Sequence, residues 1–121
     1  MGPVILDNIV WVTKDVETAK KLFKVQSDKN TEMPEREVNR DAAKGPFPFV
    51  VKEGQMPKEL AEDASAMSAC VDCDVKTVIL THHRIVLRKG NVVTVVYIFG
   101  RDNVATPEVA IWHARQVADR M

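Results

Sequence analysis

The chain has 121 residues, of which 45% are hydrophobic and 28% are charged, as expected for one soluble globular domain that needs neither metal nor disulfide to complete its core. Its 17 basic and 17 acidic side chains cancel, so no broad electrostatic field attracts phosphates or anionic lipids, and we expect no nucleic-acid partner. No apolar run approaches the ~20 residues that a bilayer-spanning helix needs, so we also expect no direct membrane insertion.

The first 27 residues predict a strand followed by a helix. Residues 4–12 form an apolar run interrupted by Asp7 and Asn8, a pattern that favours a strand with a bend or bulge at the polar pair. Thr13 or Asp15 can then cap a helix over residues 15–27, because a side-chain oxygen satisfies free N–H groups of the first helical turn. Helical spacing of the apolar residues predicts that Leu22 and Phe23 are buried.

Polar residues, prolines and a glycine dominate residues 28–46. This composition predicts a long mobile loop, with one short helical turn near residues 34–38. Residues 47–51 then favour a short strand, which Pro46 and Pro48 confine to a sheet edge or a strand start.

Residues 64–71 suit either a helix or a strand, because their alanines favour a helix whereas their alternation favours a strand. We predict a strand, since it brings the acidic segment 61–75 beside the basic segment 76–90. The two segments are then neighbouring strands whose outward charges complement one another. The alternative is a bipolar groove for a zwitterionic ligand or partner.

Two apolar runs within residues 78–99 predict a β-hairpin. Gly90 and Asn91 separate the runs, and both residue types accept the positive φ of a tight turn at low cost. The second run, residues 92–99, is apolar at nearly every position. It should therefore be a central strand or have both faces covered.

The closing segment predicts a helix over residues 106–120. Thr106 is a suitable N-cap, Pro107 fits the first helical position, and Glu108 lies where the helix dipole favours a negative charge. Together these elements predict a single α+β domain over residues 1–121. Its antiparallel sheet has about four to five strands, and both helices pack on one face.

The sequence HRIVLRKGNVVTVVYIFG from residue 83, followed by TPEVAIWHARQVADRM, resembles the final part of small extracytoplasmic α+β domains of bacterial lipoproteins and sensor proteins. These commonly have an Arg-x-Gly-Asn turn between two apolar strands and a closing helix. The resemblance implies a binding domain outside the cytoplasm without catalytic residues. The start of the chain lacks a signal-peptide pattern and a lipoprotein cysteine, which leaves a cytoplasmic location as the alternative.

Cys70, Cys73, His82 and His83 are the candidate metal ligands. They supply the ligand types of a zinc site, although the two histidines are adjacent and not three to five residues apart as in a zinc finger. Adjacent strand residues face opposite ways, so both imidazoles reach one ion only if the chain turns there. The cysteine pair could instead form a disulfide. Flanking acidic residues disfavour the thiolate that redox catalysis needs.

We therefore predict a non-catalytic binding or interaction module, of the cell envelope, for an unknown protein or small ligand, without catalytic residues or a cofactor. One alternative is a small zinc-binding or thiol-dependent enzyme that uses Cys70, Cys73 and a histidine. Another is a cytosolic homodimeric structural protein joined through exposed strand edges.

Overall fold

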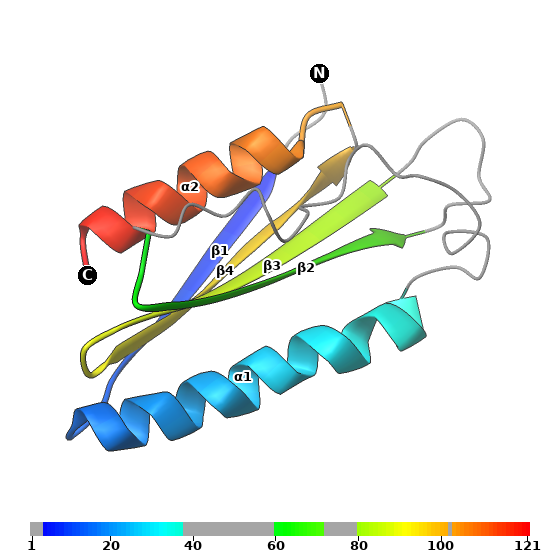
Figure 1. The fold of residues 1–121 in the computed structure, drawn as a ribbon. Helices are drawn as coiled ribbons and strands as arrows, with labels where there is room; N and C mark the ends of the chain where they lie inside the picture. The colour runs from blue at the N-terminus through cyan, green and yellow to red at the C-terminus, as the bar shows by residue number, and fades with distance from the viewer. Residues whose placement is uncertain (1–3, 38–59, 72–79, 102) are drawn as a thin grey trace.

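The structure is a computed structural model that describes residues 4–37, 60–71, 80–101 and 103–121. These residues form a four-stranded antiparallel sheet in the order β1-β4-β3-β2 and two helices (Figure 1). The elements in chain order are β1 (Ile5–Val12), α1 (Val16–Glu37), β2 (Asp63–Val71), β3 (Leu80–Lys89), β4 (Val92–Arg101) and α2 (Pro107–Asp119). The predicted α+β class and strand number are confirmed.

The two helices cover opposite faces of the sheet, with α2 above it and α1 below it in the view of Figure 1. This placement departs from the expected common face. Strand residues alternate between faces, so Ile85 and Leu87 of β3 pack in the core beneath α2, whereas Val86 packs with Ala19 of α1. Both faces of the central strands are apolar, and each therefore needs a helix of its own.

The predicted hairpin forms the centre of the sheet. Lys89 of β3 pairs with Val92 of β4 across the two-residue loop, and Gly90 adopts a positive φ of 55°, which glycine accepts without steric cost. Strand β4 lies between β1 and β3, as its nearly continuous apolar sequence predicted. Strand β2 confirms the prediction of a strand at residues 64–71.

Strand β1 is regular, so the bulge expected at Asp7 and Asn8 is absent from it. The register with β4 runs without interruption from Ile5↔Phe99 to Val12↔Val92. Both polar side chains are satisfied inside the regular ladder: the Asp7 carboxylate accepts a hydrogen bond from the Asn8 N–H at 2.9 Å, and Asn8 Oδ1 accepts one from the Thr94 hydroxyl at 2.6 Å. The chain therefore needs no extra residue there.

Helix α1 begins as predicted but is much longer than predicted. Asp15 caps it, because its carboxylate accepts a hydrogen bond from the Thr18 N–H at 2.7 Å. The prediction of a loop from residue 28 is wrong for residues 28–37, which are helical. Asn30, inside this segment, lies on the side of the helix that faces the sheet and accepts a hydrogen bond from a buried arginine, as described below. The rest of the predicted loop and the strand at residues 47–51 lie outside the described residues.

Helix α2 confirms the prediction made from its cap. Thr106 Oγ1 accepts a hydrogen bond from the Val109 N–H at 3.2 Å, and the helix begins at Pro107. Its buried side consists mainly of small residues, which lets the helix lie close to β3 and β4: Ala110, Ala114 and Ala118. Lys89 Nζ donates a hydrogen bond to the Ala118 carbonyl at 2.7 Å, which ties the end of α2 to the hairpin.

Candidate functional site

Large apolar side chains are exposed along the edge strand β1. Trp11 is half-buried, and the other apolar members of the strand are exposed to the following fractions: Ile5 60%, Leu6 49%, Ile9 40%, Val10 52% and Val12 75%. We call these five exposed residues the β1 surface. Neighbouring exposed apolar residues of this kind mark an interaction site more often than single scattered ones do.

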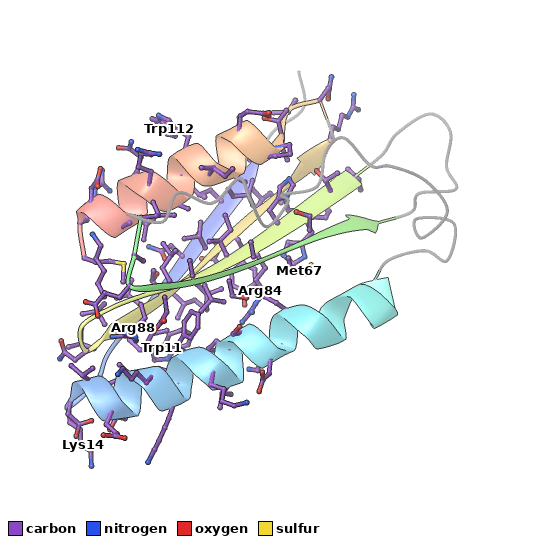
Figure 2. All side chains as sticks on the ribbon, viewed as in Figure 1. Trp11, Lys14, Met67, Arg84, Arg88 and Trp112 are labelled. Atoms are coloured by element: carbon purple, nitrogen blue, oxygen red, sulfur yellow. The ribbon has the colours of Figure 1, made fainter. Side chains whose placement is uncertain are left out.

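The position of the helices explains this exposure. Helix α1 packs on β2, β3 and β4, and α2 packs on β3 and β4. Strand β1 is an edge strand of the sheet, next to β4 (Figure 1), and it contacts α1 less than the other strands do and α2 less than β3 and β4 do. Its two faces therefore remain uncovered by the described residues, apart from Trp11, which points towards α1 and packs with Leu22 and Phe23 (Figure 2).

The outer edge of β1 also presents backbone hydrogen-bonding groups. The Thr13 N–H donates to the Asn91 carbonyl at 2.9 Å, and this pair directly follows Val12↔Val92 in the register. Hydrogen-bonded and non-hydrogen-bonded pairs alternate along an antiparallel ladder. The odd-numbered residues of β1 therefore direct their peptide groups to β4, and the even-numbered residues direct theirs outward. The Asn8 N–H bound by the Asp7 carboxylate is one of these outward groups.

A groove continues the β1 surface on the side of α2. Its volume is about 380 Å³, and Asn8, Val10 and Val12 of β1 line it together with Val117 and Met121 at the end of α2. The lining is mainly apolar, and Arg120 lies at one wall. The groove is thus continuous with the α2-side residues of the β1 surface, whereas Ile5 and Ile9 lie on the opposite face of the sheet.

The predicted metal ligands His82 and His83 lie on opposite faces of β3. The His82 ring stacks on Tyr97 with ring centroids 5.7 Å apart, whereas the His83 ring lies on the α2 side, against Ala105. One ion cannot bind both imidazoles in this arrangement. Cys70 pairs with Thr81 through the backbone of β2 and β3, and Cys73 lies outside the described residues, so a site with two cysteines and one histidine stays a prediction.

His83 is fully buried and held at both ring nitrogens. Nε2 lies 2.7 Å from the Ala105 carbonyl oxygen, which can only accept, so Nε2 carries a hydrogen. Nδ1 lies 2.7 Å from the Ser68 hydroxyl, which donates to it when the ring is neutral. Burial lowers the pKa of His83 below its ordinary value, and the Ala105 carbonyl opposes this effect in part.

A buried arginine lies between the sheet and α1 (Figure 2). The Arg84 side chain is 1% exposed. Its guanidinium donates to the Gln26 carbonyl at 2.6 Å, to Gln26 Oε1 at 2.8 Å and to Asn30 Oδ1 at 2.6 Å. It also donates to the Tyr97 hydroxyl at 3.3 Å. Among the described residues, all of its hydrogen-bond partners are neutral oxygens.

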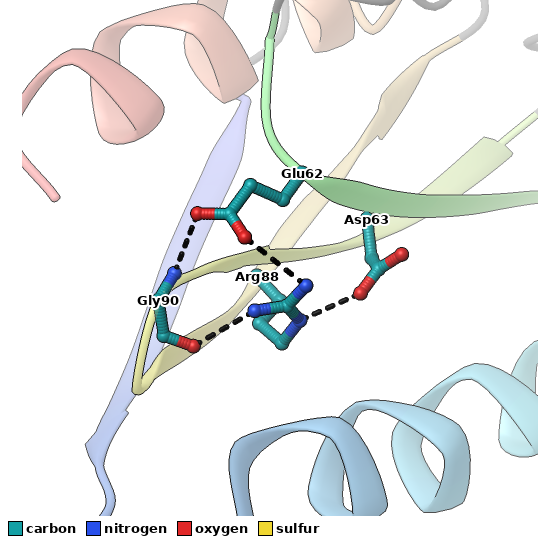
Figure 3. A network of polar contacts seen from close by, with 4 residues as sticks. All are labelled: Glu62, Asp63, Arg88 and Gly90. Carbon is teal, nitrogen blue, oxygen red and sulfur yellow. Dashed lines mark hydrogen bonds and ion pairs between the residues drawn. The ribbon is translucent and has the colours of Figure 1, made fainter. Parts of the chain in front are cut away.

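A second buried arginine joins β2 to the hairpin turn (Figure 3). Arg88 Nε donates to Asp63 Oδ2 at 2.6 Å, and Nη2 lies 3.2 Å from Glu62 Oε2. Arg88 Nη1 donates to the Gly90 carbonyl at 2.9 Å, while the Gly90 N–H donates to Glu62 Oε1 at 3.0 Å. The predicted pairing of the acidic with the basic segment is therefore confirmed at the end where β2 begins, although Arg88 is buried there and does not point outward as expected.

Sequence reasoning missed both the exposure of β1 and the Arg84 cluster. The apolar run of β1 indicated a strand but not what covers it. The Arg84 cluster did leave a signal, because Gln26 occupies a position of the apolar stripe of α1 and Asn30 follows it by one helical turn. Polar residues at these positions indicate a polar partner in the sheet.

Comparison with protein-family models, with curated proteins and with solved structures found no match for this chain. Within the described residues, neither helix is both long enough and apolar enough to cross a membrane.

Proposed function

We propose that the chain is a non-catalytic protein-interaction module and that its partner binds the β1 surface. One observation carries this proposal: an edge strand exposes five large apolar side chains to between 40% and 75% and directs peptide groups outward along the same edge. Removal of such side chains from water contributes about 25 cal/mol per Å², from which the entropic cost of association is subtracted. A partner strand would also satisfy the outward peptide groups, as in strand addition to a sheet edge.

The polar clusters support a binding role over a catalytic one. Arg84, Arg88 and His83 are buried, and each makes its contacts with other groups of the fold. These side chains connect β3 to α1, to β2 and to the segment before α2. Their polar groups are therefore engaged in holding the elements together.

The resemblance of the hairpin and closing helix to extracytoplasmic domains adds a location outside the cytoplasm to the proposal. In that compartment Cys70 and Cys73 should be oxidised and resist alkylation. Elemental analysis of protein prepared without chelator tests the enzyme alternative. Stoichiometric zinc that is lost in Cys73→Ser would favour that alternative.

Site-specific photocrosslinking tests the binding surface. A photoreactive amino acid replaces Val10, which is 52% exposed, and a matched control carries it at Val25 of α1, which is 54% exposed. In cells that produce the full chain, we expect a crosslinked protein at position 10 and none at position 25. Equal products at the two positions, or none at position 10, would contradict the proposal.

A further inference from the structure

We infer that the partner of β1 is a second copy of this chain, and that the two β1 strands pair antiparallel about a two-fold axis at Asn8. This inference rests on the proposed function and names its partner. Each sheet would then continue into the other, so that the dimer has one sheet with the order β2-β3-β4-β1-β1-β4-β3-β2.

Symmetry limits the possible registers. A two-fold axis perpendicular to the sheet keeps each face on its own side, so a residue on the α1 face must lie opposite another residue on the α1 face. Paired residue numbers must therefore add up to an even number. The outward peptide groups belong to the even-numbered residues of β1, and even-numbered residues then meet even-numbered residues, as the ladder requires.

Side-chain chemistry selects one register among these. With Asn8 at the axis, Leu6 lies opposite Val10 of the second copy and Ile5 lies opposite Trp11. Asp7 then lies directly opposite Ile9, and the two Asp7 residues are diagonal neighbours about 7–8 Å apart, not directly opposite each other. A shift that centres Asp7 would place two like charges opposite each other, which is destabilising. A register with Ile9 at the axis would place Asp7 opposite Trp11 and Asn8 opposite Val10. This register has fewer apolar pairs than the one centred on Asn8.

Charge and shape also favour a second copy. The chain has a formal net charge of zero, so two copies do not repel each other at long range. Asp7 is the only charged residue of β1. In the Asn8-centred register, Leu6 of the second copy lies beside Val10, which lines the groove under α2. The groove gives that side chain an apolar surface to cover.

Asp7 opposes this pairing. Its carboxylate accepts the hydrogen bond of the Asn8 N–H, which is the donor at the centre of the inferred ladder. Each strand must give up this local contact before the two copies pair. Asp7 thus weakens an edge that is otherwise suited to association, as charged residues on edge strands do in many proteins.

The first test is the mass of the full chain in sedimentation equilibrium. We expect a concentration-dependent approach to twice the 13.6 kDa of the chain. Val10→Lys places two lysines in the inferred interface and should weaken association by about 100-fold or more. Val25→Lys adds the same charge at an equally exposed valine and should leave the mass unchanged. Circular dichroism of both variants establishes that they are folded.

The second test uses Asp7→Ala, which releases the Asn8 N–H. It should tighten the dimer by about fivefold, because one additional hydrogen bond per copy becomes available to the partner. An unchanged or weaker association in this variant would overturn the central position of Asn8 in the pairing.

The third test determines the register. Hydrogen-bonded residues of an antiparallel pair have Cα atoms about 5.5 Å apart, a distance that a disulfide can span. Asn8→Cys should therefore form a disulfide between copies under mild oxidation, whereas Ile9→Cys should not. Peptide mapping identifies the linked residues, so that a disulfide formed by Cys70 or Cys73 is distinguished from one formed by the introduced cysteine.

The outcomes separate the two proposals. A monomer at all concentrations, combined with a photocrosslink at position 10 to a different protein, would overturn self-association and leave the interaction module standing. A dimer that Val10→Lys does not weaken would overturn the β1 interface. Crosslinks at position 10 that form only within one chain would overturn both.

Discussion

Arg84 and Arg88 lie four residues apart on the same face of β3, and both are buried, yet their charges are held in different ways. Asp63 and Glu62 pair with Arg88, and their side chains are 40% and 59% exposed. Among the described residues, the hydrogen-bond partners of Arg84 are the amide oxygens of Gln26 and Asn30, the Gln26 carbonyl and the Tyr97 hydroxyl. Water can therefore reach the partners of Arg88, whereas the main partners of Arg84 are buried.

This difference shows that two buried cations of one strand have different structural roles. Arg88 connects local elements, namely the start of β2 and the turn between β3 and β4. Arg84 holds α1 against the sheet through residues 54 and 58 positions away in sequence. Loss of the Arg84 side chain should therefore lower the stability more than loss of the Arg88 side chain. The buried oxygens of Gln26 and Asn30 that bind Arg84 are not easily reached by water, whereas Asp63 and Glu62 are.

The largest effect is expected for Arg84→Ala. Loss of the guanidinium leaves the buried oxygens of Gln26 and Asn30 without their donor, and it leaves a cavity. The free energy of unfolding should fall by about 3 kcal/mol, measured by urea denaturation. Arg84→Lys keeps the charge but lacks the planar fork, so it should restore only part of this loss. Arg115→Ala on the exposed side of α2 is the control, and a loss no larger than in this control would refute the role of Arg84.

A smaller effect is expected for Arg88→Ala. Asp63 and Glu62 can hydrate once the guanidinium is gone, so the free energy of unfolding should fall by about 1–2 kcal/mol. A double-mutant cycle with Asp63→Asn should give a coupling energy of about 1 kcal/mol. In the same cycle between Asp63 and Arg84, the two changes in the free energy of unfolding should simply add, with no coupling energy. Equal coupling in the two cycles would remove the distinction between the two arginines.

The smallest effect is expected for the third buried basic residue of β3, His83. Its pKa is lowered in the folded protein by burial, so the unfolded chain takes up a proton first as the pH falls. The contribution of His83 to stability should be complete above its ordinary pKa of 6.5 and should decrease as the pH falls from there towards the lower folded value.

Denaturation between pH 8 and pH 5, compared with the same series for His83→Asn, isolates this contribution, because titrations common to both proteins cancel in the difference. A difference that does not change with pH, or one that grows as the pH falls, would show that the buried ring is not held neutral by its surroundings.

The parts of the fold that depend on short-range chemistry were predictable from the sequence. Thr106 with Pro107 predicted the start of α2, and Gly90 predicted the turn, because in each case the decisive atoms lie within a few residues of one another. The start of α1 was predicted for the same reason with two alternative caps, Thr13 and Asp15, of which the structure shows Asp15. The helical state of Asn30 was harder to predict, because the contact of its side chain with Arg84 joins residues 54 positions apart in sequence.

The exposure of the β1 surface could not be predicted from the sequence, for a different physical reason. An apolar strand has the same sequence pattern whether its own chain or a partner covers it. Only the positions of α1 and α2 show that β1 is uncovered in the described structure. The two histidines were more informative, since their adjacency on a strand already implied opposite faces, as the structure confirms.

The pairing of β1 with β4 has a consequence for synthesis. Asn8 contacts Thr94, which lies 86 positions later in the chain, whereas the hairpin joins strands that are separated by two residues. At about 5–20 residues per second, the ribosome leaves the apolar segment ILDNIVWV without its sheet neighbour for on the order of ten seconds. Among the described strands, β1 is thus made before its neighbour β4 by most of the length of the chain, and it forms its sheet contacts late.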